Sequence, residues 1–347
     1  MSGSDVTRDG VQGARPGRDA LTGSHAGRRR RRRGRGERAM VPDAEFSSYY
    51  GRPILNRPTW KALDIAGYLY LGGLAGASSL LAAGAHATGR PALARTAKLG
   101  AAGAVSLSLA ALVHDLGRPE RFLNMLRVFK PTSPMSVGSW LLAGYAPLTV
   151  AAAAADVAGK YRLVGAAATA SAAVLGPAVA TYTAVLVSDT AVPSWHEGHR
   201  ELPYVFAGSA ATAAAGLALV CAPVGETGPA RRTAALGAVL ELGSFRVMKR
   251  RMGLTAEPFE HGRARTLLRA AETLTSVGAT LGACFGGRHR AVGAVAGAAL
   301  LAGSAALRFG VFHAGVASAE DPKYTVLPQR ERLAAGAREP GGAPPAS

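Results

Sequence analysis

The sequence predicts an all-α integral membrane protein with about eight transmembrane helices, and two observations support this. Hydrophobic residues make up 48% of the 347 residues, and they are concentrated in blocks that carry few or no charges. Each block has roughly 20 residues, the length with which a helix spans about 30 Å of hydrocarbon. The blocks cover approximately residues 62–86, 94–115, 136–158, 163–188, 203–222, 230–248, 268–286 and 290–313.

Ala and Gly replace many of the larger apolar residues within these blocks. Small residues such as Gly72, Gly73 and Gly76 of the first block let neighbouring helices approach closely. A soluble helical protein would instead need a polar face that repeats every 3.6 residues, and the stretch from Leu163 to Val187 has none. The composition therefore favours a packed bundle in a membrane.

The blocks and the regions on either side of them divide the chain into four segments. Residues 1–45 are polar, Gly-rich and basic, so we expect a disordered segment that is attracted to anionic membrane lipid. Residues 46–61 are aromatic and irregular, which predicts an interfacial segment that docks a partner. The transmembrane domain is expected over residues 62–313. The tail, residues 314–347, is expected to be an extended docking strip that is disordered at its end.

The formal net charge is +18, but its distribution argues against nucleic acid as a partner. Lys and Arg are more numerous in the tails and even-numbered loops than in the opposite loops. Because positive charge accumulates on the cytoplasmic side, we expect both termini to be cytoplasmic, in a multi-pass protein of the cell membrane. The connections on that side are also longer, which suggests that a partner protein docks there.

Ionisable residues gather where the predicted spans reach this face. The segment from His114 to Phe122 ends the second span, and such residues are costly in a membrane unless they pair or face water. Other polar groups are expected at the same depth on neighbouring spans and in the loop after the fourth span, so we predict one shared pocket. Its candidate residues are Asp64, Tyr68, His114, Asp115, Tyr182 and His196.

Each of these residues also has a simpler interpretation. Asp64 favours a helix N-terminus, and His114 complements the negative end of a helix C-terminus. Asp115 and Arg118 could form a local ion pair that fixes the loop. Arg121 could be an interfacial side chain that extends toward the headgroups.

Glu241 differs from the others because it falls near the middle of the sixth span. A carboxylate in mid-membrane needs a partner or water. Arg246, five residues on, is not on the same helix face, so we expect a partner from another helix. Two interpretations remain open: a buried structural pair, or a residue on a proton path.

No bound metal and no haem are expected. Two cysteines, Cys221 and Cys284, are too few for a zinc or iron–sulfur site. Haem with two histidine ligands would need a facing pair at matched depth, for which only His114 and His313 are candidates.

Four motifs resemble those of a known family. The stretches His114–Phe122, Tyr68–Gly76 and Val192–Trp195 resemble the NrfD/PsrC family of polysulfide-reductase-type membrane subunits. The stretch Asp321–Arg330 resembles the tail of actinobacterial members that accompany formate dehydrogenases.

The resemblance implies two four-helix bundles and a haem-free site for menaquinone or a related quinone. It also implies an iron–sulfur ferredoxin-like partner subunit that exchanges electrons with a molybdopterin oxidoreductase subunit. Carried over by position, His114 and Asp115 would be the reactive groups. The same comparison gives Asp64, Tyr68 and Tyr182 as quinone-binding residues. Well-known members place this face outside the cytoplasm, whereas the charge distribution here places it inside.

We therefore expect a membrane-anchoring, quinone-binding subunit of a multisubunit oxidoreductase, with no complete catalytic activity of its own. Candidates for docking the partner are Tyr49, Tyr50, Arg118, Arg121 and Tyr324. The alternatives are a secondary transporter or proton-conducting protein that uses Glu241, and a passive membrane anchor.

Overall fold

The computed structural model describes residues 6–7, 10–11, 54–56, 58–115 and 119–336. The chain divides into two compact units, residues 1–46 and residues 47–347. In the first unit, strands β1 (Val6–Thr7) and β2 (Gly10–Val11) pair antiparallel, with Val6 opposite Val11. The predicted disorder over most of residues 1–45 and at the end of the tail lies outside the described residues.

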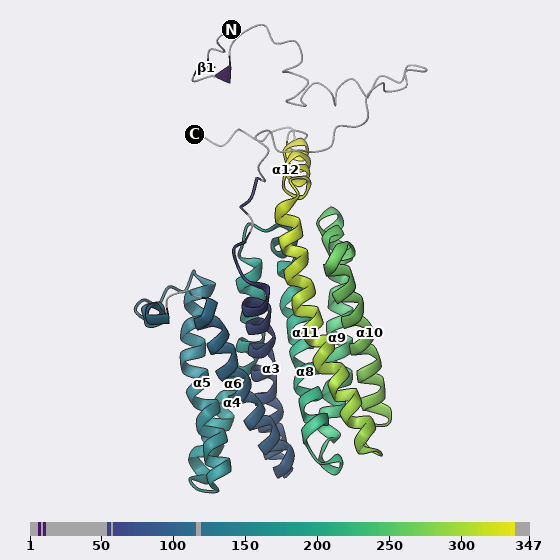
Figure 1. Ribbon diagram of the computed structural model, residues 1–347. Helices are drawn as coiled ribbons and strands as arrows, with labels where there is room; N and C mark the ends of the chain where they lie inside the picture. The colour runs from purple at the N-terminus through teal and green to yellow at the C-terminus, as the bar shows by residue number, and fades with distance from the viewer. Residues whose placement is uncertain (1–5, 8–9, 12–53, 57, 116–118, 337–347) are drawn as a thin grey trace. The chain divides into compact units, whose positions relative to one another are not determined.

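All regular secondary structure described in the second unit is helical (Figure 1). Its eight long helices lie where the eight spans were predicted. Short helices connect them at α7 (Pro193–Glu197), η1 (Pro119–Leu126), η2 (Gly198–Arg200), η3 (Val224–Glu226) and η4 (Gly253–Glu260). The long helices are α3 (Ala62–Ala87), α4 (Pro91–Asp115), α5 (Pro134–Ala158), α6 (Arg162–Ser188), α8 (Leu202–Cys221), α9 (Gly228–Met252), α10 (Gly262–Cys284) and α11 (Arg290–Glu320).

Local sequence explains several helix ends. Proline occupies the first turn of α5, α7, α8 and α9, where its missing N–H costs nothing because no intrahelical acceptor exists there. Helix α5 ends at Gly159, whose φ of 63° is in the left-handed region that glycine adopts without strain. A sharp reversal into α6 follows.

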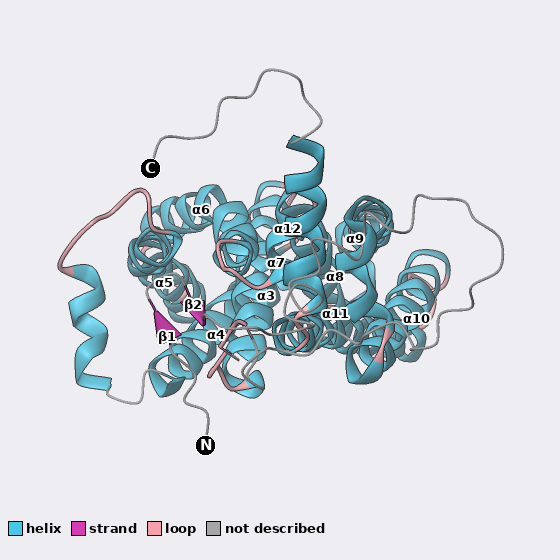
Figure 2. Ribbon diagram, turned by 90° about the horizontal axis from the view of Figure 1, so that it is seen from above, coloured by secondary structure: helices cyan, strands magenta, loops and turns pink. Residues whose placement is uncertain are grey.

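The long helices form two four-helix bundles, as the resemblance implied. In the first bundle α3, α4, α5 and α6 each contact the next, and α6 returns to α3; α8, α9, α10 and α11 form the second bundle in the same way. Helices α3 and α6 contact α8, and α3 also contacts α11, so one apolar core runs through both bundles. Figure 2 shows α3 between the two bundles in the view from above.

Glycine pairs set the closest helix approaches in both bundles. A Cβ atom on Gly76 of α3 would collide with the backbone of Gly176 in α6, and the converse also holds. Gly216 of α8 and Gly297 of α11 form the equivalent contact in the second bundle. In each bundle the first and last helices are therefore held together by backbone contact, as small-residue packing in membranes predicts.

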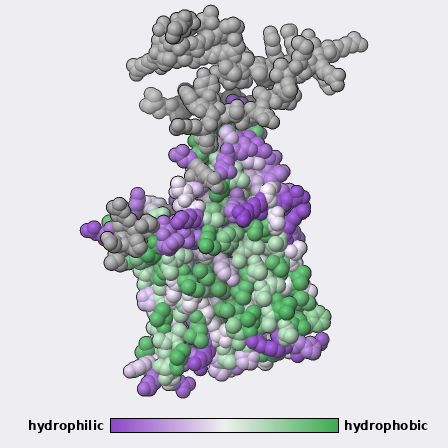
Figure 3. Space-filling view, in the orientation of Figure 1, coloured by the Kyte–Doolittle hydropathy of each residue, from purple (hydrophilic) through white to green (hydrophobic). Residues whose placement is uncertain are grey.

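The fold is that of an all-α integral membrane protein. Among the described helices, six are long and apolar enough to cross a membrane: α3, α4, α5, α6, α8 and α11. Helices α9 and α10 complete the second bundle but carry more charge, including Arg231, Glu241 and Arg246 on α9. Figure 3 shows hydrophobic side chains over the middle of the helical body and hydrophilic ones at both ends.

The C-terminal region differs from the sequence expectation. Helix α11 continues beyond residue 313, the predicted end of the transmembrane domain, to Glu320. The stretch from Asp321 to Arg330, predicted to be extended, mostly lies in helix α12 (Lys323–Gly336), which continues through Pro328. We call the end of the body at which α3 begins and α11 ends the upper face, and the opposite end the lower face.

Candidate functional site

Asp64 and His114 meet at the upper face because α3 and α4 are antiparallel neighbours. Asp64 lies in the first turn of α3, and His114 lies in the last turn of α4. The Nδ1 atom of His114 is 3.1 Å from Oδ2 of Asp64. The carboxylate is buried, whereas 67% of the imidazole is exposed. Both residues keep the helix-end positions that simpler interpretations assigned to them, and they also form a pair.

A cavity of about 280 Å³ opens beside this pair, between α3, α4, α5 and α6. We call it the first cavity. Its walls are mostly apolar and include Trp60, Leu142 and Leu186. Three of the predicted site residues line it: Tyr68, Asp115 and Tyr182. Asp64 and His114 are beside the cavity but outside its lining.

The two tyrosines of the first cavity lie edge to face. Their ring centroids are 6.5 Å apart and the ring planes are inclined at 75°. The ring of Tyr182 fits against α5 because Gly138 has no side chain there; a Cβ atom at that position would collide with the ring. Neither tyrosine hydroxyl donates a hydrogen bond to a residue that the structure describes. Both therefore keep an unused donor.

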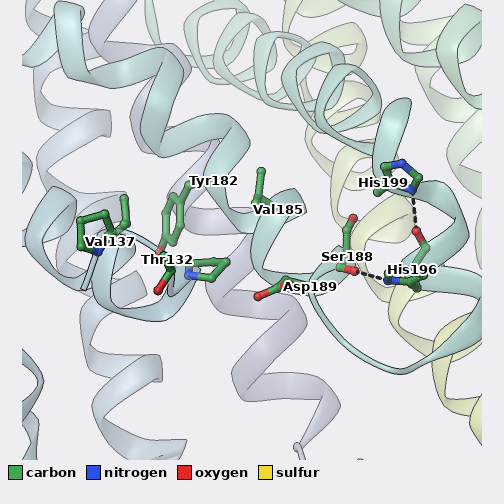
Figure 4. Close-up of a pocket in the computed structure, with 10 residues that line it drawn as sticks. Thr132, Val137, Tyr182, Val185, Ser188, Asp189, His196 and His199 are labelled. Atoms are coloured by element: carbon green, nitrogen blue, oxygen red, sulfur yellow. Dashed lines mark hydrogen bonds between the residues drawn. The ribbon is translucent and has the colours of Figure 1, made fainter. Parts of the chain in front are cut away.

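A second cavity, of about 600 Å³, lies on the other side of Tyr182 (Figure 4). Val137 and Tyr182 are at one end of it, and His196 and His199 are at the other. The Nδ1 atom of His196 is 3.2 Å from the carbonyl oxygen of Ser188, and that of His199 is 2.9 Å from the carbonyl oxygen of His196. The predicted single pocket is therefore two cavities that share Tyr182, and His196 belongs to the second.

Trp195 fixes the loop that carries these histidines. Its indole Nε1 donates to the carbonyl oxygen of Val311 at 2.8 Å, and its ring stacks on Trp60 with centroids 5.9 Å apart. The ring passes directly over Gly315 of α11, where any Cβ atom would overlap it. Since Trp60 also lines the first cavity, the Val192–Trp195 motif connects the second bundle to the wall of that cavity.

An ion pair holds the other end of the same loop. Arg251, at the end of α9, donates from Nε and Nη2 to the two carboxylate oxygens of Glu201, each at 2.7 Å. This hydrogen bonding from Arg251 holds the pKa of Glu201 below its usual range. Arg251 also donates to the carbonyl oxygen of Glu197. The loop between α6 and α8 is thus anchored on both sides of the two histidines.

The tail docks on the chain itself rather than presenting Tyr324 to a partner. The Tyr324 side chain is buried, and its hydroxyl donates to Oε2 of Glu257 at 3.2 Å. Lys323 donates to the same oxygen at 2.8 Å, and this bond lowers the pKa of Glu257. The other predicted docking residues, Tyr49, Tyr50 and Arg118, lie outside the described residues, as does the side chain of Arg121.

Glu241 lies within the second bundle, away from both cavities. Its carboxylate is 1% exposed and accepts hydrogen bonds from Thr212 of α8 at 3.2 Å and Thr275 of α10 at 3.1 Å. The expected partner on another helix is thus a pair of hydroxyl groups. Arg246 pairs with Glu272 on α10, at 2.8 Å, which confirms that it is not the partner of Glu241.

A buried arginine accompanies Glu241, and the sequence interpretation did not select it. Arg308 of α11 is 0% exposed, and its Nη2 donates to the carbonyl oxygen of Phe206 at 2.9 Å. Its guanidinium lies 3.6 Å from the centroid of the Phe206 ring. Its Nε and Nη1 have no hydrogen-bond partner among the described residues. The sequence signal that could have identified this residue is an arginine inside a predicted apolar span.

The first bundle has a charged contact of its own, near the lower face. Lys98 of α4 is buried, and its Nζ lies 2.8 Å from Oδ1 of Asp156 on α5. Ser79 of α3 and Tyr145 of α5 form a hydrogen bond of 2.6 Å in the same bundle. The sequence interpretation passed over all four residues, although a lysine within an apolar block is unusual.

Comparison with known proteins identifies the family. Residues 53–286 match the family described as "Polysulphide reductase, NrfD", and this match covers more than half of the chain. No curated protein matches the chain. The chain belongs to the NrfD family, as the motifs around Tyr68, His114 and Trp195 indicated.

Proposed function

We propose that this NrfD-family membrane protein is the quinone-reactive, membrane-anchoring subunit of an oxidoreductase complex. The observation that carries the proposal is the first cavity. It is largely apolar, it lies near the upper face between four helices, and it contains the polar groups of Tyr68, Asp115 and Tyr182. An apolar cavity with a few convergent polar groups is the usual form of a site for a small apolar ligand.

The chemistry of a quinone fits these groups. A quinone headgroup is a flat ring with two carbonyl oxygens, and its reduction to the quinol adds two electrons and two protons. The hydroxyl groups of Tyr68 and Tyr182 can donate to one carbonyl oxygen, and Asp115 can exchange a proton at the other. The cavity is at the small end of the range for ligand sites, which suits the ring with its tail outside.

We assign His114 to proton exchange with solvent rather than to direct contact. Its ring is largely exposed, and it pairs with Asp64, which lies one helical turn before Tyr68. An exposed imidazole can pass protons between water and a buried carboxylate. His196 and His199 in the second cavity would form the approach to Tyr182 from the other side.

The electrons would come from, or go to, a partner on the upper face. We propose an iron–sulfur ferredoxin-like subunit there, associated with a molybdopterin oxidoreductase of the formate dehydrogenase type, and menaquinone or a related quinone as the substrate. The support is that the short helices α7, η2 and η4 and the docked tail all lie at the face where both cavities are found.

We also propose that the upper face is cytoplasmic. The run from Lys249 to Arg251 ends α9 at this face, and positive residues favour the cytoplasm. Reporter fusions at the C-terminus test this orientation. Activity of a cytoplasmic reporter supports it, and activity of an exported reporter alone would reverse it.

The test of the quinone site is substitution of His114 and Asp115 in the assembled complex. We expect His114→Ala and Asp115→Asn to abolish quinone-linked turnover while the complex still assembles. His86→Ala is the matched control, because His86 ends α3 at the lower face. Normal turnover in both variants would rule out this site and leave a passive anchor as the function.

A proton path through Glu241 is a separate proposal, supported by the second bundle. Glu241 and Arg308 are both buried there without an ion pair between them, and two donors of Arg308 have no partner among the described residues. Buried donors of this kind usually bind ordered water, and water could carry protons to Glu241. Proton flux into liposomes that contain the purified protein tests this; flux unchanged by Glu241→Gln would leave Glu241 a structural residue.

A further inference from the structure

The seam between α9 and α10 contains a charged mouth and an apolar groove that the quinone function does not use. The mouth is a cavity of about 400 Å³ at the upper face, between α9, η4 and α10. Lys249, Arg265 and Arg269 line it, together with the apolar side chains of Phe245, Phe259 and Leu268. We call this cavity the seam mouth.

The seam mouth has an excess of positive charge. Its two carboxylates already have partners: Glu260 accepts from Lys249 at 3.0 Å, and Glu272 accepts from Arg246 at 2.8 Å. Arg265 and Arg269 are exposed, lie four residues apart on one face of α10, and have no ion-pair partner within the described part of the chain. Two guanidinium groups are therefore available for an anion.

Another cavity, of about 550 Å³, lies along the same two helices, on the lower side of the seam mouth. We call it the seam groove. It is lined mainly by small and apolar residues, among them Val239, Gly243 and Ala279, and it ends near Ala283. Arg246 lines the groove, and its partner Glu272 lines the mouth, so the two cavities adjoin.

Helical spacing places residues of the mouth and of the groove on one face of α9. On α9, Ala235, Val239, Leu242 and Lys249 recur at intervals of three, four and seven residues, which places them on one face. Lys249 lies fourteen positions after Ala235, a rise of about 21 Å, which exceeds the roughly 15 Å depth of one hydrocarbon leaflet.

The seam groove faces outward from the bundle. Val239 and Gly243 are exposed, whereas Glu241, between them in sequence, points into the bundle and is buried. Lipid in the surrounding membrane can therefore reach the groove directly. The groove is separate from the buried centre formed by Glu241 and Arg308.

We propose that this seam binds an anionic phospholipid, with its phosphate between Arg265 and Arg269 and an acyl chain in the seam groove. Basic pockets between membrane helices bind anionic headgroups by charge attraction. An uncharged quinone has no negative charge to attract the two arginines. A free phosphate ion would use the mouth but not the groove.

The experiment is a binding titration of the delipidated full-length chain in detergent, followed by native mass spectrometry. The probes are phosphatidylglycerol, phosphatidylcholine with the same acyl chains, and inorganic phosphate as a competitor. We expect phosphatidylglycerol to be preferred. The double substitution Arg265→Gln and Arg269→Gln should weaken its binding by about tenfold. Arg232→Gln with Arg288→Gln is the matched control, because both arginines are exposed beyond the lower end of the groove.

A second variant tests the acyl chain. No atom lies within 4 Å of a Cβ atom built on Gly243, so Gly243→Leu should fill the groove without a clash. We expect this substitution to weaken the binding of long-chain phosphatidylglycerol several-fold and to leave the binding of a dihexanoyl analogue unaffected. Gly144→Leu on α5, also in open space, is the control. Equal binding of the two lipids, or no effect of either seam variant, would overturn the proposal. If inorganic phosphate displaces the lipid and Gly243→Leu has no effect on lipid binding, the seam binds free phosphate instead.

Discussion

The two bundles have the same helix arrangement, yet they place their polar groups in opposite ways. In the first bundle the polar groups Tyr68, Asp115 and Tyr182 line a cavity near the upper face. In the second bundle Glu241 and Arg308 are buried within the helices. The first bundle thus offers a site to a ligand near the upper face and pairs its buried Lys98 with Asp156, whereas the second encloses a carboxylate and a guanidinium that form no ion pair with each other.

The difference follows from the depth at which each group lies on its helix. Asp64 and Asp115 are in the terminal turns of α3 and α4, where a side chain can reach the membrane surface. Glu241 lies thirteen residues into α9 and must be satisfied by neighbours such as Thr212 and Thr275. Similar side chains therefore serve different purposes in the two bundles.

The largest effect is expected from the two tyrosines of the first cavity. Replacing Tyr68 and Tyr182 together by Phe removes both donors and keeps the ring contacts, so we expect quinone-linked turnover to fall by about 100-fold. Turnover of the assembled complex measures this. Tyr204→Phe, at an exposed position on α8, should have no effect. Unchanged turnover in the double variant would remove the functional difference between the bundles.

Packing of the loop between α6 and α8 against α11 depends on Gly315. Gly315→Ala forces a methyl group into the indole of Trp195, and overpacking of this kind should cost about 3 kcal/mol of unfolding free energy. Thermal unfolding in detergent measures the loss. Gly103→Ala is the control because that position on α4 has open space. A stable Gly315→Ala variant would show that the two bundles do not need this contact.

The enclosed charge of the second bundle should depend on its hydroxyl groups. Thr212→Val with Thr275→Val leaves Glu241 without its two donors, and we expect a loss of about 2 kcal/mol in unfolding free energy. Thr273→Val, on the exposed face of α10, is the control in the same unfolding experiment. Quinone-linked turnover should stay unchanged in these variants if the two bundles have separate tasks.

The smallest effect is expected at the docked tail. Because the folded-state pKa of Glu257 is depressed by Lys323, its stabilising contribution is present above the ordinary pKa of 4.5 and is lost as the pH falls through the folded value. The pair is partly exposed, so the effect should be about 0.5 kcal/mol or less.

Hydrogen exchange of α12 at pH 7 and pH 3 measures this effect. Protection should fall at the lower pH, and Lys323→Gln should lower protection at pH 7. The pKa of Lys323 is raised by the same bond, so at high pH protection should be lost only well above its ordinary value of 10.5. Protection independent of both pH and Lys323 would show that burial of Tyr324 alone docks the tail.

Much of the fold could be predicted because a membrane simplifies the sequence pattern. A span needs a long apolar run, which six of the eight long helices have, and the eight predicted blocks lie on the eight long helices. The pattern was less informative at the tail. Helix α12 has a short, mixed sequence with Pro328 inside it, and its position depends on Tyr324 and Lys323 contacting η4.

The site was predictable in part. The sequence predicted that Asp64, His114 and Asp115 lie at the same depth in the bundle, because this depth follows from where the spans begin and end. The sequence could not predict that the pocket is divided into two cavities, because the division depends on the Tyr182 ring lying against Gly138. Arg308 was passed over because a single charge in an apolar run does not reveal which carbonyl or ring it contacts.

The sequence by itself determined the family, the membrane class, the number of long helices and the face at which polar groups gather. Hydrophobic length and local motifs encode these properties without reference to distant residues. Only the tertiary structure decided which residues are in contact: Tyr68 with Tyr182, Glu241 with Thr212, and Trp195 with Gly315. Those meetings depend on the rotation and spacing of helices, which packing between residues far apart in the chain sets.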